Sequence, residues 1–252
     1  MKNLKAIMAA AVLSVATSAS AQTTIAQSAS AEANSVNNGW STVSIEWTPG
    51  KLSPDTGDSW SFTGLSLGYS RTISVSKNTP LYIETGLGLQ YSFLSKMEKL
   101  SGYYNKATGT FYDTSLYGGT YVNAKVDIDG SLFTAKVPVE LLYAWQLPDS
   151  KVTLIPHTGI NLRINIMGKA KIKADVSGSG ISESEEQTYN LFNEDDMGGT
   201  SNTMNRFQIG WQIGLKARFN NLFMLGLSYE YDSKIFTKAN TKGVSVTAGL
   251  TF

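Results

Sequence analysis

The 252-residue chain has no cysteine, which excludes disulfides, thiolate metal sites, cysteine nucleophiles and a lipid-modified N-terminal cysteine. It has a single histidine, so several histidines cannot gather around one metal ion. Charged residues make up only 16% of the sequence, compared with about 25% in ordinary soluble proteins. A formal net charge of +1 gives no reason to expect a nucleic-acid partner. Beyond the N-terminal segment, no apolar run reaches the length of about 18 residues that indicates a transmembrane helix.

The chain begins with an export signal. Lys2 and Lys5 precede a mostly apolar run over 6–16, and Ala19-Ser20-Ala21 is a cleavage site of the small-x-small type. The apolar run is too short to span a bilayer, because a helix needs about 20 residues for that. We predict three segments, a signal peptide over 1–21, a flexible Ala/Ser/Asn-rich segment over 22–39 and one folded domain over 40–252.

The folded domain alternates apolar and polar residues with a period of two. Over 81–93 the odd positions are mostly apolar and the even positions are polar or glycine, and 207–219 repeats the pattern. Such alternation places one face of a strand among apolar groups and the other among polar groups. We count eight alternating segments, at about 40–48, 60–75, 80–96, 131–147, 151–174, 204–219, 222–235 and 243–252.

Short and long links alternate between these segments. The short links are Ser76-Lys77-Asn78, Pro148-Asp149 and Asn220-Asn221. Most segments are also long enough to cross a bilayer, which takes about 9–11 residues in a tilted strand. Both features are typical of membrane barrels with short periplasmic turns and long outer loops. The sequence therefore predicts an all-β fold, an eight-stranded antiparallel up-and-down transmembrane β-barrel.

Aromatic residues on the apolar face fall into two groups, as expected for rings at the two headgroup levels of a membrane. Near the short turns lie Tyr143, Trp145, Phe219, Phe223 and Phe252, and toward the long loops lie Trp47, Tyr91, Phe93, Phe207, Tyr229 and Tyr231. A soluble lipocalin-like carrier is the less favoured alternative. It would have to expose the apolar face to water or bury residues such as Glu84 and Lys216 in a small core.

The last strand alternates and ends on phenylalanine, with Val244, Val246, Ala248, Leu250 and Phe252 on one face. This resembles the terminal assembly signal of Gram-negative outer-membrane barrels. The region 40–252 resembles the small outer-membrane β-barrel families of the OmpA/OmpX type or porin-like barrel domains. The resemblance implies a place in the cell outer membrane, contact with outer-membrane lipid and insertion by the barrel assembly machinery. It implies no particular cargo.

The polar face holds acids and bases in equal number. An eight-stranded barrel is only wide enough to be filled by side chains, so we expect a structural polar plug, with a small porin for small solutes as the alternative. Gly86, Gly88, Gly210 and Gly214 are expected to make room for long side chains. The expected lumen network comprises Glu46, Glu84, Glu140 and Glu230, Lys136, Arg163, Lys216 and Arg218, and His157 and Gln212.

Some small outer-membrane barrels are lipid-modifying enzymes that use serine, histidine and an acid. Here His157 is the only histidine, and the sequence places no serine beside it. We therefore predict a non-enzymatic protein with no catalytic residue, metal or cofactor. A two-residue turn at Pro148-Asp149 predicts paired residue numbers that sum to 297. Glu140 would then lie opposite His157 and Lys136 opposite Asn161.

The outer loops are the predicted working parts, with a structural or surface-binding role toward an extracellular protein or glycan. The link 97–130 is rich in tyrosine, and the link 175–203 is acidic, with a weak cation site left open at Glu194-Asp195-Asp196. Alternation over 121–126 and 169–174 indicates that the fourth and fifth strands project outward as a ribbon. A change of parity between Val126 and Ala135 predicts a bulge or turn near Asp129-Gly130.

Overall fold

The computed structural model describes most of the region predicted to fold. The described residues are 39–54, 59–76, 79–105, 110–112, 120–178, 181–197, 203–236 and 239–252. The predicted signal peptide and nearly all of the predicted flexible segment lie outside them, as does the short link at Lys77-Asn78. Among the described residues, no helix is long and apolar enough to cross a bilayer.

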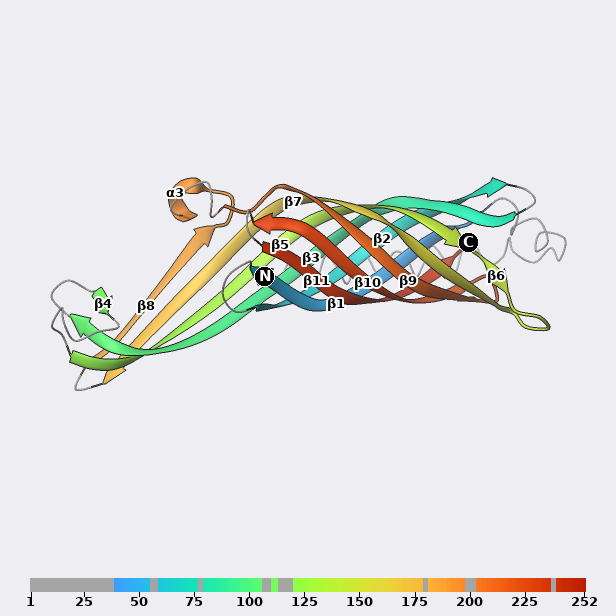
Figure 1. Cartoon of the computed structure of the whole chain (residues 1–252). Helices are drawn as coiled ribbons and strands as arrows, with labels where there is room; N and C mark the ends of the chain where they lie inside the picture. The colour runs from blue at the N-terminus through green and yellow to red at the C-terminus, as the bar shows by residue number, and fades with distance from the viewer. Residues whose placement is uncertain are drawn as a thin grey trace, which may run out of the picture.

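Eight long strands close into an antiparallel barrel (Figure 1). They are β1 (Ser41–Pro54), β2 (Trp60–Ser76), β3 (Thr79–Asn105), β5 (Thr120–Tyr143), β7 (Val152–Gly178), β9 (Phe207–Phe219), β10 (Phe223–Phe236) and β11 (Ala239–Thr251). Each strand pairs with its neighbours in chain order, and β11 pairs with β1 to complete the ring. The predicted eight-stranded up-and-down barrel is confirmed.

Four short elements complete the described chain. Strand β4 (Thr110–Tyr112) pairs with β3, and β6 (Trp145–Gln146) and β8 (Ile181–Asn190) both pair with β7. A single helical turn, α3 (Glu194–Met197), follows β8.

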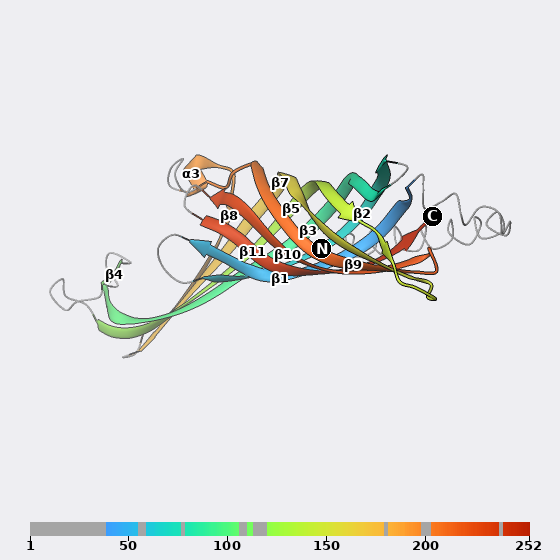
Figure 2. The ribbon, with the colours of Figure 1, turned by 45° about the vertical axis from the view of Figure 1, so that its right-hand side comes forward.

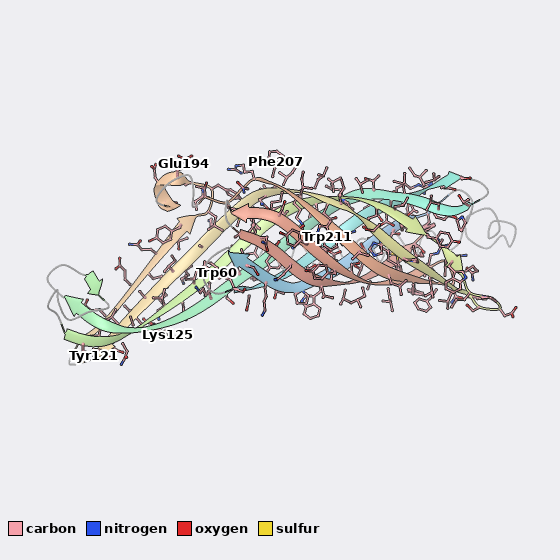
Figure 3. All side chains as sticks on the ribbon, viewed as in Figure 1. Trp60, Tyr121, Lys125, Glu194, Phe207 and Trp211 are labelled. Carbon is pink, nitrogen blue, oxygen red and sulfur yellow. The ribbon has the colours of Figure 1, made fainter. Side chains whose placement is uncertain are left out.

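The outer surface of the barrel is apolar. Along β9, every second residue from Phe207 to Leu215 is exposed, and the residues between them face inward. The exposed side chains include large ones such as Leu87 and Trp211, and Figure 3 shows side chains projecting along the outside of the barrel. A closed barrel with an apolar exterior satisfies its backbone hydrogen bonds internally and suits a hydrocarbon solvent. The strands therefore span a membrane.

A cluster of buried apolar side chains lies toward each end of the lumen. The cluster at the short-turn end contains Trp40, Tyr82, Leu142, Ala144 and Ile155. The cluster at the opposite end contains Leu52, Phe62, Leu94, Leu132, Ala170, Leu191, Met204, Ile235 and Ala239. The polar side chains of the lumen lie between the two clusters.

Three strands continue well past the barrel. Strands β3, β5 and β7 run on together, and β8 adds to β7, so that a sheet projects from the end opposite the short turns (Figures 1 and 2). The predicted outward projection of strands four and five, β5 and β7, is confirmed. The prediction of a long loop over 97–130 is wrong, because the β3–β5 pairing extends to Tyr104 and Thr120. The acidic link likewise contains β8 and α3.

The predicted register between β5 and β7 is wrong by two residues. Leu142 lies opposite His157, and Glu140 lies opposite Gly159, so paired numbers sum to 299 rather than 297. Lys136 faces Arg163 instead of Asn161.

The physical reason lies in the turn. The chain turns over 148–151, where the Leu147 N–H donates to the Val152 carbonyl and Asp149 has a φ of 53°. A register shift of two residues keeps each side chain on the same face of the sheet, because side chains alternate with a period of two.

The predicted bulge near Asp129-Gly130 is also wrong. Pairing runs without a shift through Asp129, and the irregularity lies farther in, where Ile166 is an extra residue on β7 opposite Phe133 and Thr134. Along β5 the even residues stay on the inner face throughout, as the burial of Val122 and Lys136 shows. Along β5 the apolar residues switch between even and odd positions because the surroundings of the outer face change. Inside the membrane the outer face is apolar, and beyond it the outer face meets water.

Candidate functional site

The lumen contains a dense layer of ionised groups. All the residues predicted for the polar network point into the barrel. Their side chains are buried except for Glu46, which is 17% exposed. This layer and the projecting sheet are the two regions whose chemistry could carry a function.

One half of the layer is built around a shared carboxylate. Lys136 and Arg163 face each other on β5 and β7, and the carboxylate of Glu230 on β10 contacts both of them at 2.7 Å. Lys136 Nζ also lies 3.0 Å from Glu46 Oε1 on β1. Arg163 Nε lies 3.0 Å from Asp232 Oδ1. These ion pairs connect strands on opposite sides of the lumen.

Asp232 also belongs to this network, although the predicted set does not include it. It occupies the next inward position after Glu230 on β10, so the alternation could have identified it. Arg218 was assigned to the network but stands apart from it. Its guanidinium lies 4.1 Å from the ring centroid of Trp40, and it makes no ion pair with any described residue.

The other half of the layer surrounds Lys216. Its ammonium group lies 2.8 Å from Glu84 Oε1 and 2.8 Å from Glu140 Oε2, which connects β9 to β3 and β5. Thr72 donates a hydrogen bond to Glu84, and the Gln212 amide donates one to Glu140. Both carboxylates are therefore fixed by more than one partner.

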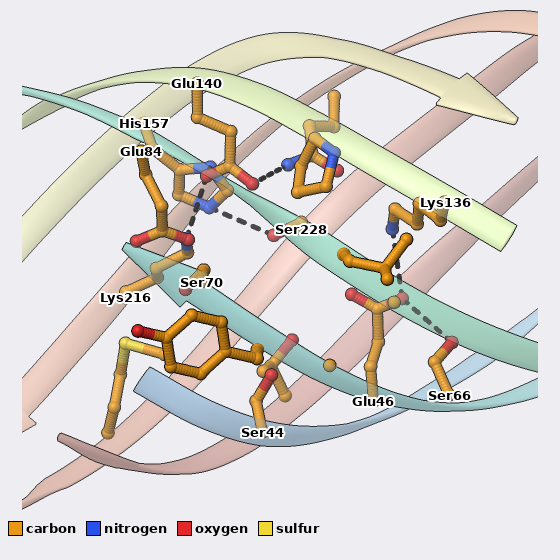
Figure 4. Close-up of a pocket in the computed structure, with 18 residues that line it drawn as sticks. Ser44, Glu46, Ser66, Ser70, Glu84, Lys136, Glu140, His157, Lys216 and Ser228 are labelled. Carbon is orange, nitrogen blue, oxygen red and sulfur yellow. Dashed lines mark hydrogen bonds and ion pairs between the residues drawn. The ribbon is translucent and has the colours of Figure 1, made fainter. Parts of the chain in front are cut away.

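Glu140 also contacts the only histidine. His157 Nδ1 lies 2.9 Å from Glu140 Oε2, although the N–H is not well aligned with that oxygen. On the other side of the ring, His157 Nε2 lies 3.0 Å from Ser228 Oγ (Figure 4). Ser228 is the serine that the sequence could not place, and it is only 6% exposed. The structure therefore brings a serine, a histidine and an acid together in the lumen.

Gly214 on β9 makes this contact possible. It pairs with His157 on one side and with Ser228 on the other. A Cβ atom there would lie 2.7 Å from His157 Nε2 and 2.5 Å from Ser228 Oγ. Gly210 likewise makes room for Asp232, whereas a Cβ at Gly88 would meet nothing closer than 3.8 Å. At Gly86 the close neighbours are the Tyr69 carbonyl and Ser70.

A cavity of about 70 Å³ adjoins these groups. Glu140, His157 and Ser228 line it on one side, together with Lys136 and Lys216. Small residues line the opposite wall, where Ser44, Gly68 and Gly88 occupy one row across β1, β2 and β3. The cavity is large enough for water or for a small organic group.

The predicted assembly residues lie on the outside of β11. Val244 and Val246 are each 43% exposed, and Phe252 is 58% exposed. The backbone of Phe252 exchanges two hydrogen bonds with Ser41 at the start of β1. The end of the chain therefore helps to close the barrel.

The projecting sheet has a polar groove of about 680 Å³ on its water-facing side. Four lysines line it with two aspartates and three serines: Lys96, Lys125, Lys171, Lys173, Asp127, Asp129, Ser59, Ser61 and Ser95. Figure 3 shows Lys125 on this projection, close to Tyr121.

Several of the groove lysines are paired. Lys125 lies 2.6 Å from Asp127, and Lys173 lies 2.9 Å from Asp175. Hydrogen bonds from the Ser184 hydroxyl and from Lys173 lower the pKa of Asp175, and the Asp175 carboxylate raises the pKa of Lys173.

The acidic segment after β8 uses one of its carboxylates for local structure. Asp196 accepts a hydrogen bond of 2.8 Å from the backbone N–H of Asn190. Within the part of the chain that the structure describes, no three acidic or histidine side chains come together as metal ligands.

A closed ring of strands, an apolar exterior and a filled polar lumen together define the architecture. The chain is a small transmembrane β-barrel. No protein-family model matches it, and no curated protein matches it significantly.

Solved structures that match the chain include bacterial surface and outer-membrane proteins. The attachment invasion locus protein Ail of Yersinia pestis is 19% identical over 85% of this chain and 99% of its own, with a TM-score of 0.36. Neisserial surface protein A is 15% identical over 84% and 97%, with a TM-score of 0.35. The outer membrane enzyme PagL is 10% identical over 82% and 97%, with a TM-score of 0.34.

Proposed function

We propose that the barrel is a closed membrane anchor and that the projecting sheet binds an extracellular ligand. The observation that carries this proposal is the continuation of β3, β5 and β7 past the barrel as a sheet with a polar groove. Strand length beyond the membrane adds nothing to anchoring, so the projection has a use outside the bilayer.

The lumen supports a closed anchor over a small porin. Lys136 and Lys216 each join carboxylates from two other strands, and a cluster of buried apolar side chains lies toward each end of the described barrel. Separating these buried groups would leave each charge without a partner in a low-dielectric interior, so thermal motion opens the network rarely. In planar bilayers we expect no steady conductance from the purified mature protein. A stable open channel would support the porin instead.

The groove supports a hydrophilic ligand. Its volume falls within the range of about 300–1,000 Å³ common for ligand sites, although its walls are more polar than usual. Four lysines and two aspartates line the groove, and two of the lysines pair with the neighbouring carboxylates Asp175 and Glu186. An acidic glycan fits this chemistry best, because its hydroxyl groups bond to serines and its acidic groups can replace the present lysine partners. A protein ligand is the alternative.

Binding to dextran sulfate, with neutral dextran as the reference, tests the glycan form of the proposal. The double variant Lys171→Ser with Lys173→Ser removes two groove lysines. The matched control is Lys51→Ser with Lys242→Ser, which removes two exposed lysines that pair across β1 and β11. We expect dextran sulfate to bind better than dextran, and only the groove variant to lose that binding. Equal loss in both variants would show attraction to overall charge and not to the groove.

The C-terminal strand supports a second proposal, on assembly. The outward side chains of Val244, Val246, Ala248, Leu250 and Phe252 form one apolar edge at the chain end. We propose that the barrel assembly machinery recognises this strand, and deletion of Phe252 tests the proposal.

A further inference from the structure

We propose that Ser228, His157 and Glu140 form a nucleophile site that accepts the acyl group of a small ester. The site lies inside the barrel and is separate from the groove on the projecting sheet. It therefore concerns an activity beyond ligand binding at the cell surface.

The order of contacts is the one that serine activation requires. Ser228 Oγ lies 3.0 Å from His157 Nε2, and Glu140 Oε2 lies 2.9 Å from the other ring nitrogen. In serine nucleophile sites the histidine takes the hydroxyl proton on one nitrogen, and the acid supports the other. The imperfect alignment at Nδ1 is common in such sites without substrate.

The strands hold the three groups from different directions. Ser228 belongs to β10, His157 to β7 and Glu140 to β5, and Gly214 on β9 leaves the space in which they meet. Lys216 and Gln212 fix the Glu140 carboxylate. The rotation of these side chains is therefore restricted before any substrate arrives.

A purely structural hydrogen-bond chain would need no space beside the serine. Here all three groups line the cavity of about 70 Å³. Ser66 lines the same cavity, but its hydroxyl contacts Glu46 at 3.4 Å and no histidine. Ser228 therefore differs from Ser66 because it contacts a general base, His157.

The cavity lining carries fixed charges of both signs. The cations Lys136 and Lys216 line it together with the acids Glu46, Glu84 and Glu140. Fixed charge aimed at a developing oxyanion is a major source of rate enhancement in acyl transfer. The cavity of about 70 Å³ has room for only a small molecule, which restricts the substrate to a short acyl group on a small alcohol.

The reaction balances without any cofactor. Ser228 Oγ forms a bond to the acyl carbon, His157 takes the hydroxyl proton and gives it to the departing alcohol oxygen, and the ester C–O bond breaks. Water then attacks the acyl-serine, with its proton passing through His157 back to Ser228 Oγ. The products are one carboxylic acid and one alcohol.

Methanesulfonyl fluoride tests the nucleophile because it is small and leaves a stable adduct on an activated serine. The folded mature protein in detergent is treated with it, and peptide mass mapping locates the adduct. We expect modification at Ser228, none in the Ser228→Ala variant, and labelling slower by about 100-fold in His157→Gln. The matched control is Ser92→Ala, which removes a buried lumen serine that does not line the cavity and should label at the rate of the unchanged protein.

Mapping of the unchanged protein decides the question even if a variant fails to fold. Heat-modifiable gel migration reports folding of each variant. Absence of an adduct at Ser228, or equal labelling of several lumen serines, would overturn the proposal. With the adduct located, hydrolysis of methyl acetate followed by proton NMR should be faster with the unchanged protein than with Ser228→Ala. Equal rates would overturn turnover of a small ester.

Discussion

Lys136 and Arg163 lie directly opposite each other on neighbouring strands, and both contact the carboxylate of Glu230. Like charges in directly opposed positions destabilise a sheet. Glu230 offsets this repulsion by placing one oxygen on each cation. The carboxylate is fully enclosed, so its charge is not screened by solvent.

Replacing Glu230 should therefore destabilise the barrel strongly. We expect Glu230→Gln to lower the free energy of unfolding by about 3–5 kcal/mol, because two buried cations lose their shared partner. The matched change Glu46→Gln should cost less, since Glu46 pairs with a single cation, Lys136, and is partly exposed. Urea unfolding in detergent micelles measures both. A smaller loss for Glu230→Gln than for Glu46→Gln would show that the shared carboxylate is not the centre of the network.

An added methyl group should destabilise the barrel at one glycine of the lumen face and have little effect at another. Gly214→Ala places a Cβ 2.4 Å from the Leu227 carbonyl and close to His157, so the strands must shift. We expect a loss of about 1–3 kcal/mol in the free energy of unfolding. Gly88→Ala should change stability little, because its Cβ meets only atoms at 3.8 Å or beyond. Thermal unfolding of both variants provides the comparison, and an equal effect would contradict the close approach at Gly214.

Removing Phe252 should affect assembly in cells more than intrinsic stability. Its side chain is exposed on the outer face, and its backbone makes two hydrogen bonds to Ser41. Losing these bonds costs about 1–3 kcal/mol at most. We expect a strong loss of insertion in cells and a small change in detergent refolding of the purified chain. Comparable losses in both assays would mean that the terminal residue acts through stability alone.

The number of strands and the face of each residue were predictable because both follow from a period of two. The inward position of Gln212 and the outward position of Trp211 need no knowledge of neighbouring strands. The pairing of Glu140 with Gly159 depends on where a turn is centred, and a shift of two residues leaves the hydrophobic pattern unchanged.

The contact between His157 and Ser228 could not be predicted for the same reason. The two residues are 71 positions apart and meet across Gly214, so their contact requires the register of three strands. The inverted pattern over 121–126 had another cause. The outer face exchanges lipid for water where β5 leaves the membrane, so Val122 faces inward and Lys125 faces water. The apolar residues therefore change between odd and even positions along a regular strand, and the prediction of a bulge from this change was wrong.

The pair formed by Lys173 and Asp175 on the projecting sheet predicts linked titrations. The Ser184 hydroxyl and Lys173 lower the pKa of Asp175, and the hydrogen bond from Lys173 to Asp175 raises the pKa of the lysine. The contribution of Asp175 is present above its ordinary pKa and is lost as the pH falls through the lowered value. The contribution of Lys173 is present below its ordinary pKa and is lost as the pH rises through the raised value. The pair therefore stays intact through neutral pH.

NMR titration of the Lys173 and Asp175 side chains tests this coupling. Asp175→Asn should return the pKa of Lys173 toward its ordinary value, because the first cause of the shift is the hydrogen bond to that carboxylate. Ser184→Ala should raise the pKa of Asp175 and change that of Lys173 less. The control Asp149→Asn lies in the short turn at the other end of the barrel and should leave both unchanged. An unchanged Lys173 titration in Asp175→Asn would mean that the two side chains do not pair on the projecting sheet in solution.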